Sequence, residues 1–185
     1  MKKVLSIFIF SIIFFFAAQL VFAQEKMATD EALLSKTPTP IDYQLPYPGL
    51  LPDSPLYFLK IFRDRLIDFL VADPLKKAEL SLLQADKRLS SGQALFAKGK
   101  KELAESTISK GENYFEQGIL KLKEAKKQGM DTKGLLEKFA LSVKKHQEIV
   151  ADLIKQASGD VKKRLENLDK RILEFEKQVS LLSPK

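Results

Sequence analysis

The chain has 185 residues, of which 31 are basic and 24 acidic, giving a formal net charge of +7 at neutral pH. It contains no cysteine, which excludes disulfides, thiol catalysis, cysteine metal ligands and a lipid-modified cysteine anchor. The length fits a single domain, which must be held together by packing alone.

Residues 1–23 have the pattern of a secretory signal peptide. Two lysines precede a long apolar run, and the small residues Val21 and Ala23 stand where a cleavage site requires them. We therefore predict cleavage before Gln24 and an extracytoplasmic location, either secreted or in the cell envelope. The alternative is an uncleaved anchor formed by residues 4–23 with the rest of the chain outside, because about 20 apolar residues can span a bilayer.

Residues 24–53 are predicted to be a proline-rich linker that leads into the first helix. The run Thr37-Pro38-Thr39-Pro40 lacks helical periodicity, so we expect a flexible spacer over residues 24–46. Four apolar residues after it are expected to fold over the end of the helical domain as a plug: Leu50, Leu51, Leu56 and Tyr57. A docking peptide for a partner is the alternative use of this motif.

Apolar residues recur every three or four positions from residue 54 onward, which predicts a helical-bundle domain over residues 54–185. The stripe slips by one residue at Gly99 and at Gly159, so we place breaks there. Asp73 followed by proline is a helix start signal. The predicted helices are 55–71, 74–98, 100–128, 132–157 and 160–182.

Short connections between long helices predict an all-α fold, an elongated antiparallel bundle with coiled-coil-like packing. Residues 132–182 could instead form a protruding helical hairpin. In the first helix, five apolar side chains share one face: Leu56, Leu59, Phe62, Leu66 and Phe69. The core is the expected place for the Phe62 ring.

Two segments resemble a known family. The first is Tyr47 to Lys60, which reads YPGLLPDSPLYFLK, and the second combines DPLKKAEL at residues 73–80 with ADKRL at residues 85–89. They are similar to the bacterial domain-of-unknown-function family 5667, an exported helical domain, over roughly residues 47–150. The resemblance implies export and a helical fold, and it carries over neither an activity nor a catalytic residue.

Site chemistry is sparse in this sequence. His146 is the only histidine; we expect it at the edge of the bundle, bonded to a carboxylate or water, where it could act as a weak pH sensor. A di-metal bundle would need a second histidine, and neither a nucleophile elbow nor a phosphate loop is present. Paired carboxylates such as Glu102 and Glu105 are expected on outer faces. We therefore predict no catalytic, cofactor-binding or metal-ligating residue.

These patterns predict a non-enzymatic, exported helical-bundle protein of the bacterial cell envelope. It would act through contacts with an envelope protein or as a structural spacer, and it would meet the membrane only through an uncleaved leader. The alternative is electrostatic binding of an anionic component such as lipid head groups, an anionic polymer or extracellular DNA, without specific nucleic-acid recognition. An enzyme is the third alternative, for which a buried cluster of polar side chains would be the sign.

Overall fold

The computed structural model describes residues 41–183 and contains five α-helices and no strand in that part of the chain. The helices are α2 (Tyr57–Leu70), α3 (Pro74–Ala97), α4 (Lys101–Lys127), α5 (Lys133–Gln156) and α6 (Gly159–Leu182). Their ends lie within two residues of the predicted ones. The predicted all-α fold is therefore confirmed.

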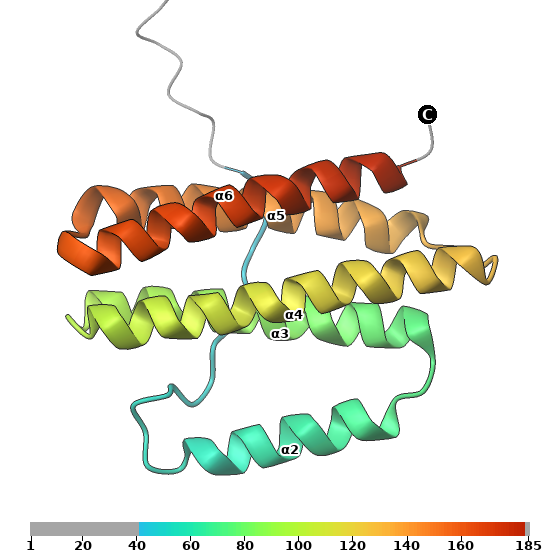
Figure 1. Cartoon of the computed structure of the whole chain (residues 1–185). Helices are drawn as coiled ribbons and strands as arrows, with labels where there is room; N and C mark the ends of the chain where they lie inside the picture. The colour runs from blue at the N-terminus through green and yellow to red at the C-terminus, as the bar shows by residue number, and fades with distance from the viewer. Residues whose placement is uncertain (1–40, 184–185) are drawn as a thin grey trace, which may run out of the picture. The chain divides into compact units, whose positions relative to one another are not determined.

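The four longer helices form a two-layer bundle (Figure 1). α3 packs along α4, and α5 packs along α6. The two pairs are joined because α6 lies against α4 and α5 lies against α3. Both helices of residues 132–182 thus belong to the bundle and do not protrude as a separate hairpin.

Glycines and one aspartate set the ends of these helices. Gly99, Gly129 and Gly159 have φ angles of 77°, 77° and 57°, a conformation that side chains with a Cβ rarely adopt. The breaks that the slipped stripes predict at Gly99 and Gly159 are therefore confirmed. At the start of α3, Asp73 Oδ1 accepts a hydrogen bond from the backbone N–H of Lys76 at 2.7 Å, which confirms the predicted cap.

Three buried phenylalanines fill the middle of the bundle. The Phe115 ring lies 5.3 Å from that of Phe139 and 5.6 Å from that of Phe175, measured between centroids. Gly118 allows this packing, because a Cβ at that position would lie 2.7 Å from the Phe139 ring. The small residues of the α4 stripe are thus explained by a close approach of neighbouring side chains.

The segment before α2 crosses the bundle. The Ile41 backbone N–H donates to Glu148 on α5 at 3.0 Å, and the Tyr43 hydroxyl donates to Asp86 on α3 at 2.6 Å. Two leucines of the segment also pack against the core, Leu45 and Leu51. Residues 41–46, predicted to belong to a flexible spacer, therefore lie against the helices.

The predicted leader and the first part of the predicted linker, residues 1–40, lie outside the described residues. Among the helices that are described, none combines the length and apolar character that crossing a membrane requires. Residues 41–185 form one compact unit, and its core is built from α3, α4, α5 and α6.

Candidate functional site

A polar cluster lies buried where α3, α4 and α5 meet. The His146 ring is within hydrogen-bond distance of two carboxylates: Nδ1 is 2.8 Å from Glu112 Oε1, and Nε2 is 3.0 Å from Asp86 Oδ1. Asp86 also accepts hydrogen bonds from the hydroxyls of Ser142 and Tyr43, both at 2.6 Å. These contacts connect three helices and the segment that precedes α2.

The surroundings of His146 fix its protonation state. Carboxylate oxygens only accept hydrogen bonds, so both ring nitrogens must donate, and the ring is an imidazolium. Burial lowers the pKa of His146, but the charges and hydrogen bonds of Glu112 and Asp86 outweigh burial and raise the pKa to about 9. Burial, followed by the charge of Asp86, raises the pKa of Tyr43, so its hydroxyl remains a donor.

The position of His146 was only partly predicted. Its side chain is completely buried, so the expected place at the bundle edge is wrong, whereas the expected carboxylate partner is confirmed. Sequence analysis missed Asp86 and Glu112. Each follows a small stripe residue, Ala85 and Gly111 respectively, and this is the weak signal that could have pointed to them.

The buried cluster is the feature that we expected of an enzyme, and its side chains are hydrogen-bonded to one another. Ser142 donates to Asp86 and not to the imidazole, so no nucleophile faces the base. One oxygen of Glu112 is buried without a partner. Within residues 41–183, no group of three or more His, Cys, Asp or Glu side chains is arranged to hold a metal ion. The cluster joins α3, α4 and α5 through side-chain hydrogen bonds.

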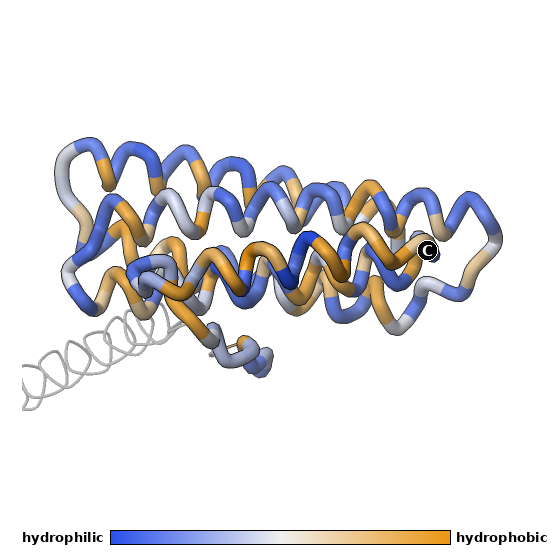
Figure 2. The backbone as a smooth tube through the Cα atoms, turned by 90° about the horizontal axis from the view of Figure 1, so that it is seen from below, coloured by the Kyte–Doolittle hydropathy of each residue, from blue (hydrophilic) through white to orange (hydrophobic). Residues whose placement is uncertain are grey.

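A second feature lies on the outside of the molecule, on α2. Six large apolar side chains of this helix are between 48% and 83% exposed: Phe58, Leu59, Phe62, Leu66, Phe69 and Leu70. At 3.6 residues per turn these positions fall within an arc of about 120°. They form one strip, here called the α2 surface, and Figure 2 shows apolar and polar segments alternating along this helix. Apolar patches of this kind mark interaction sites.

The orientation of α2 contradicts the prediction that Phe62 lies in the core, since this side chain is 69% exposed. The face turned inward is polar instead. Asp64 is the only buried residue of α2 and pairs with Arg63 at 2.7 Å, while the Lys60 ammonium donates to the backbone carbonyl of Pro48 at 2.7 Å. The core of the four longer helices contains no side chain of α2, and the hydrogen bond from Arg88 on α3 to Tyr57 joins α2 to the bundle.

The predicted plug is formed only in part. Leu51 packs against the core, and the half-buried Tyr57 accepts a hydrogen bond from Arg88 Nη1 at 3.3 Å. Leu50 and Leu56 are 44% and 53% exposed, so they do not cover the end of the bundle. Their exposure extends the apolar area beyond the first turn of α2.

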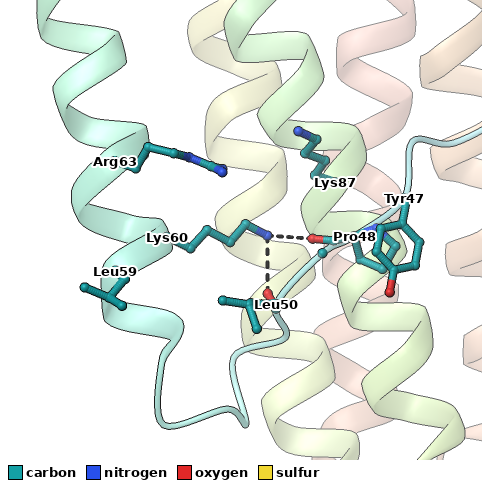
Figure 3. A pocket seen from close by; sticks show the side chains of 8 residues that line it. Tyr47, Pro48, Leu50, Leu59, Lys60, Arg63 and Lys87 are labelled. Carbon is teal, nitrogen blue, oxygen red and sulfur yellow. Dashed lines mark hydrogen bonds between the residues drawn. The ribbon is translucent and has the colours of Figure 1, made fainter.

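Basic side chains flank the α2 surface. Lys60, Arg63 and Lys87 line a pocket of about 390 Å³ on one side, and Figure 3 shows their charged ends around the chain at Pro48 and Leu50. Burial lowers the pKa of Lys60, and the positive neighbours Lys87 and Arg63 add to this effect. This margin therefore concentrates positive charge next to exposed apolar residues.

A second pocket, of about 360 Å³, lies on the other side of α2 and is lined by Arg65, Arg88 and Lys110 from three different helices. On α6, Arg164 donates to Glu105 at 2.7 Å. Glu105 is itself buried, so its predicted place on an outer face is wrong.

Comparison with known proteins adds a family but no activity. A family model described as a domain of unknown function, DUF5667, matches residues 49–180. The match confirms the resemblance seen in the sequence and extends it from the predicted limit near residue 150 into α6. No curated protein and no solved structure matches the chain.

Proposed function

The chain belongs to this family, described as a domain of unknown function (DUF5667), and we propose that it is an exported, non-enzymatic protein of the bacterial cell envelope. In this proposal the bundle is a rigid body that docks on an anionic membrane surface through α2. The observation that carries it is the apolar α2 surface, which faces outward between two basic margins.

The physical character of α2 suits a helix that lies in a membrane interface. Such helices place phenylalanine and leucine at the acyl boundary and keep lysine and arginine at the level of the head groups. By their spacing, Arg63 and Arg65 fall just outside the apolar arc, one on each side. Their long side chains can extend toward phosphates while the apolar strip is buried. The net charge of +7 also favours an anionic surface.

The leader pattern supports delivery to that surface. If it remains uncleaved, residues 24–40 connect it to the described part of the chain and span at most about 60 Å. A 24-residue helix such as α5 is about 36 Å long, so this tether suffices for α2 to reach the bilayer. If the leader is cleaved, binding rests on α2 and its basic margins alone.

A protein partner for α2, or a spacer role for the bundle, is the competing function. An apolar groove on a protein would cover the α2 surface without calling for positive charge on both margins. The positive charge on both margins is therefore the reason to prefer a membrane surface over a protein partner for α2. If the protein binds neither kind of vesicle in the experiment below, a protein partner or a spacer role becomes the favoured function.

The test uses the chain without residues 1–23, the form predicted after cleavage of the leader, and circular dichroism checks its fold. Flotation is measured with phosphatidylcholine vesicles and with equimolar phosphatidylcholine–phosphatidylglycerol vesicles. We expect binding to the anionic vesicles, weakened several-fold to about tenfold by Leu66→Ser. Leu141→Ser is the matched control, because Leu141 on α5 is 45% exposed against 48% for Leu66.

Two results would overturn this function. One is a wild-type chain that floats with neither vesicle. The other is an equal loss of binding in both serine variants, because the α2 surface would then have no special part in docking.

A further inference from the structure

The pocket lined by Arg65, Arg88 and Lys110, here called the arginine pocket, has the composition of an anion site. Its three cations come from α2, α3 and α4, and the other lining residues include Tyr57, Tyr114 and Asn113. No aspartate or glutamate lines it. Three positive charges thus converge on one cavity of about 360 Å³ without a carboxylate among them.

The hydrogen-bonding capacity of these cations is largely unused. Among the described residues, Arg65, Arg88 and Lys110 form no ion pair. Arg88 Nε is buried without a hydrogen-bond partner. A buried donor of this kind is costly to leave unsatisfied, and the exposed cations of Arg65 and Lys110 give the pocket further donors for a ligand that accepts hydrogen bonds.

Arg88 is also held in place. Its guanidinium lies over the Tyr114 ring, 4.8 Å from the centroid, and Nη1 donates to the Tyr57 hydroxyl at 3.3 Å. Stacking on one ring and a bond to another restrict the side chain, so little freedom is lost when an anion binds. The fork of guanidinium donors matches the oxygens of a phosphate.

The pocket on the opposite side of α2, lined by Lys60, Arg63 and Lys87, differs from the arginine pocket in how its cations are bonded. There the Lys60 ammonium is bonded to the carbonyls of Pro48 and Leu50 (Figure 3), at 2.7 and 3.4 Å. Arg63 is paired with Asp64. Lys60 and Arg63 thus already have acceptors within the protein, and Lys87 is the one cation of this pocket whose charged group has neither a hydrogen bond nor an ion pair among the described residues. The arginine pocket therefore has more free capacity for an anion.

We infer that the arginine pocket binds the phosphate of an anionic glycerophospholipid head group while the adjoining α2 surface contacts the acyl chains. The inference rests on the proposed docking of α2 and adds a defined lipid subsite to it. Arg65 and Arg88 are assigned to the phosphate oxygens, and Lys110, which is exposed at the rim, to the net negative charge of the head group.

The test compares two double variants that remove the same charge. Arg65→Gln with Lys110→Gln empties the pocket of two exposed cations, and Lys144→Gln with Lys162→Gln removes two exposed cations from α5 and α6. We expect the pocket variant to bind equimolar phosphatidylcholine–phosphatidylglycerol vesicles at least about tenfold more weakly than wild type. The control variant should lose clearly less, and binding to phosphatidylcholine alone should be unchanged in both.

Failure of the pocket and failure of docking give different results. Equal losses in the two double variants would overturn the lipid subsite and leave only a net-charge effect, while the α2 surface would still dock if Leu66→Ser remained defective. Wild-type protein that binds neither vesicle would overturn both. A third arm adds inorganic phosphate: if phosphate alone abolishes vesicle binding, the pocket prefers a free anion, and the lipid assignment is wrong.

Discussion

Raising the pH should lower the free energy of unfolding, because it deprotonates the His146 imidazolium that is hydrogen-bonded to Glu112 and Asp86. The pKa of His146 is raised from 6.5 to about 9, so the folded chain holds this proton more tightly than the unfolded chain does. Its contribution to stability is fully present below about pH 6.5 and is lost as the pH rises through about 9. Each tenfold change in proton affinity is worth about 1.4 kcal/mol, so the free energy of unfolding should fall by roughly 3 kcal/mol.

The groups around the His146 ring determine how large this loss of stability is. Glu112 and Asp86 face the ring nitrogens at 2.8 and 3.0 Å, and the Tyr43 hydroxyl, bonded to Asp86, stays protonated because its pKa is raised. Once the imidazolium is neutral, two buried carboxylates remain without a positive partner, which is a costly arrangement.

Urea unfolding, followed by circular dichroism at steps from about pH 6 to about pH 10, measures the effect. His146→Gln is the control, because it removes the titration while other groups still respond to pH. Since His146 is the only histidine, its ring resonance also reports its pKa directly by nuclear magnetic resonance. A wild-type stability that follows the same pH course as His146→Gln, or a histidine that titrates near 6.5 in the folded protein, would refute this reasoning.

Substitutions at three positions test the packing and the capping. Gly118→Ala places a Cβ 2.7 Å from the Phe139 ring and should lower the free energy of unfolding by about 1–3 kcal/mol. Gly134→Ala, where a Cβ meets nothing within 4 Å, should raise it by up to about 1 kcal/mol; equal effects in urea unfolding would contradict this. Asp73→Ala removes the acceptor for the Lys76 N–H and should cost about 1 kcal/mol, most of which Asp73→Asn should restore. No loss in Asp73→Ala would show that the cap contributes nothing.

The four long helices were predictable because their signals are local. A stripe that slips by one residue at Gly99 and at Gly159 reveals a turn in the sequence itself, and the positive φ angles there give the physical cause. Gly118 is likewise a small member of the apolar stripe of α4, which predicts close packing at that position. Short connections then leave few ways to arrange four helices, so the bundle follows.

The orientation of α2 could not be read from its periodicity. An apolar stripe shows that one face will be covered, but it does not identify what covers it. In this chain the other face carries Lys60, which donates to the carbonyl of Pro48, and the buried Asp64, which pairs with the neighbouring Arg63. Phe62 is therefore turned to the outside, although its spacing is that of a core residue.

The buried cluster was hidden for a related reason. His146 was recognisable as a polar member of a stripe. Its pairing with Asp86 and Glu112, however, depends on how three helices are rotated about their axes and shifted along the bundle axis relative to one another. Periodicity within one helix fixes neither quantity. A lone acid next to a small stripe residue is too common a pattern to identify such a pairing.

A single tryptophan reporter tests the central claim that the α2 surface enters a membrane interface. The chain has no tryptophan, so Phe62→Trp places the only one on α2, and Leu141→Trp places it on α5 as the control. With equimolar phosphatidylcholine–phosphatidylglycerol vesicles, we predict that the emission of Phe62→Trp shifts to shorter wavelength and is shielded from an aqueous quencher, while Leu141→Trp does not change. Unchanged emission from Phe62→Trp, or the same shift in both variants, would contradict the docking of α2.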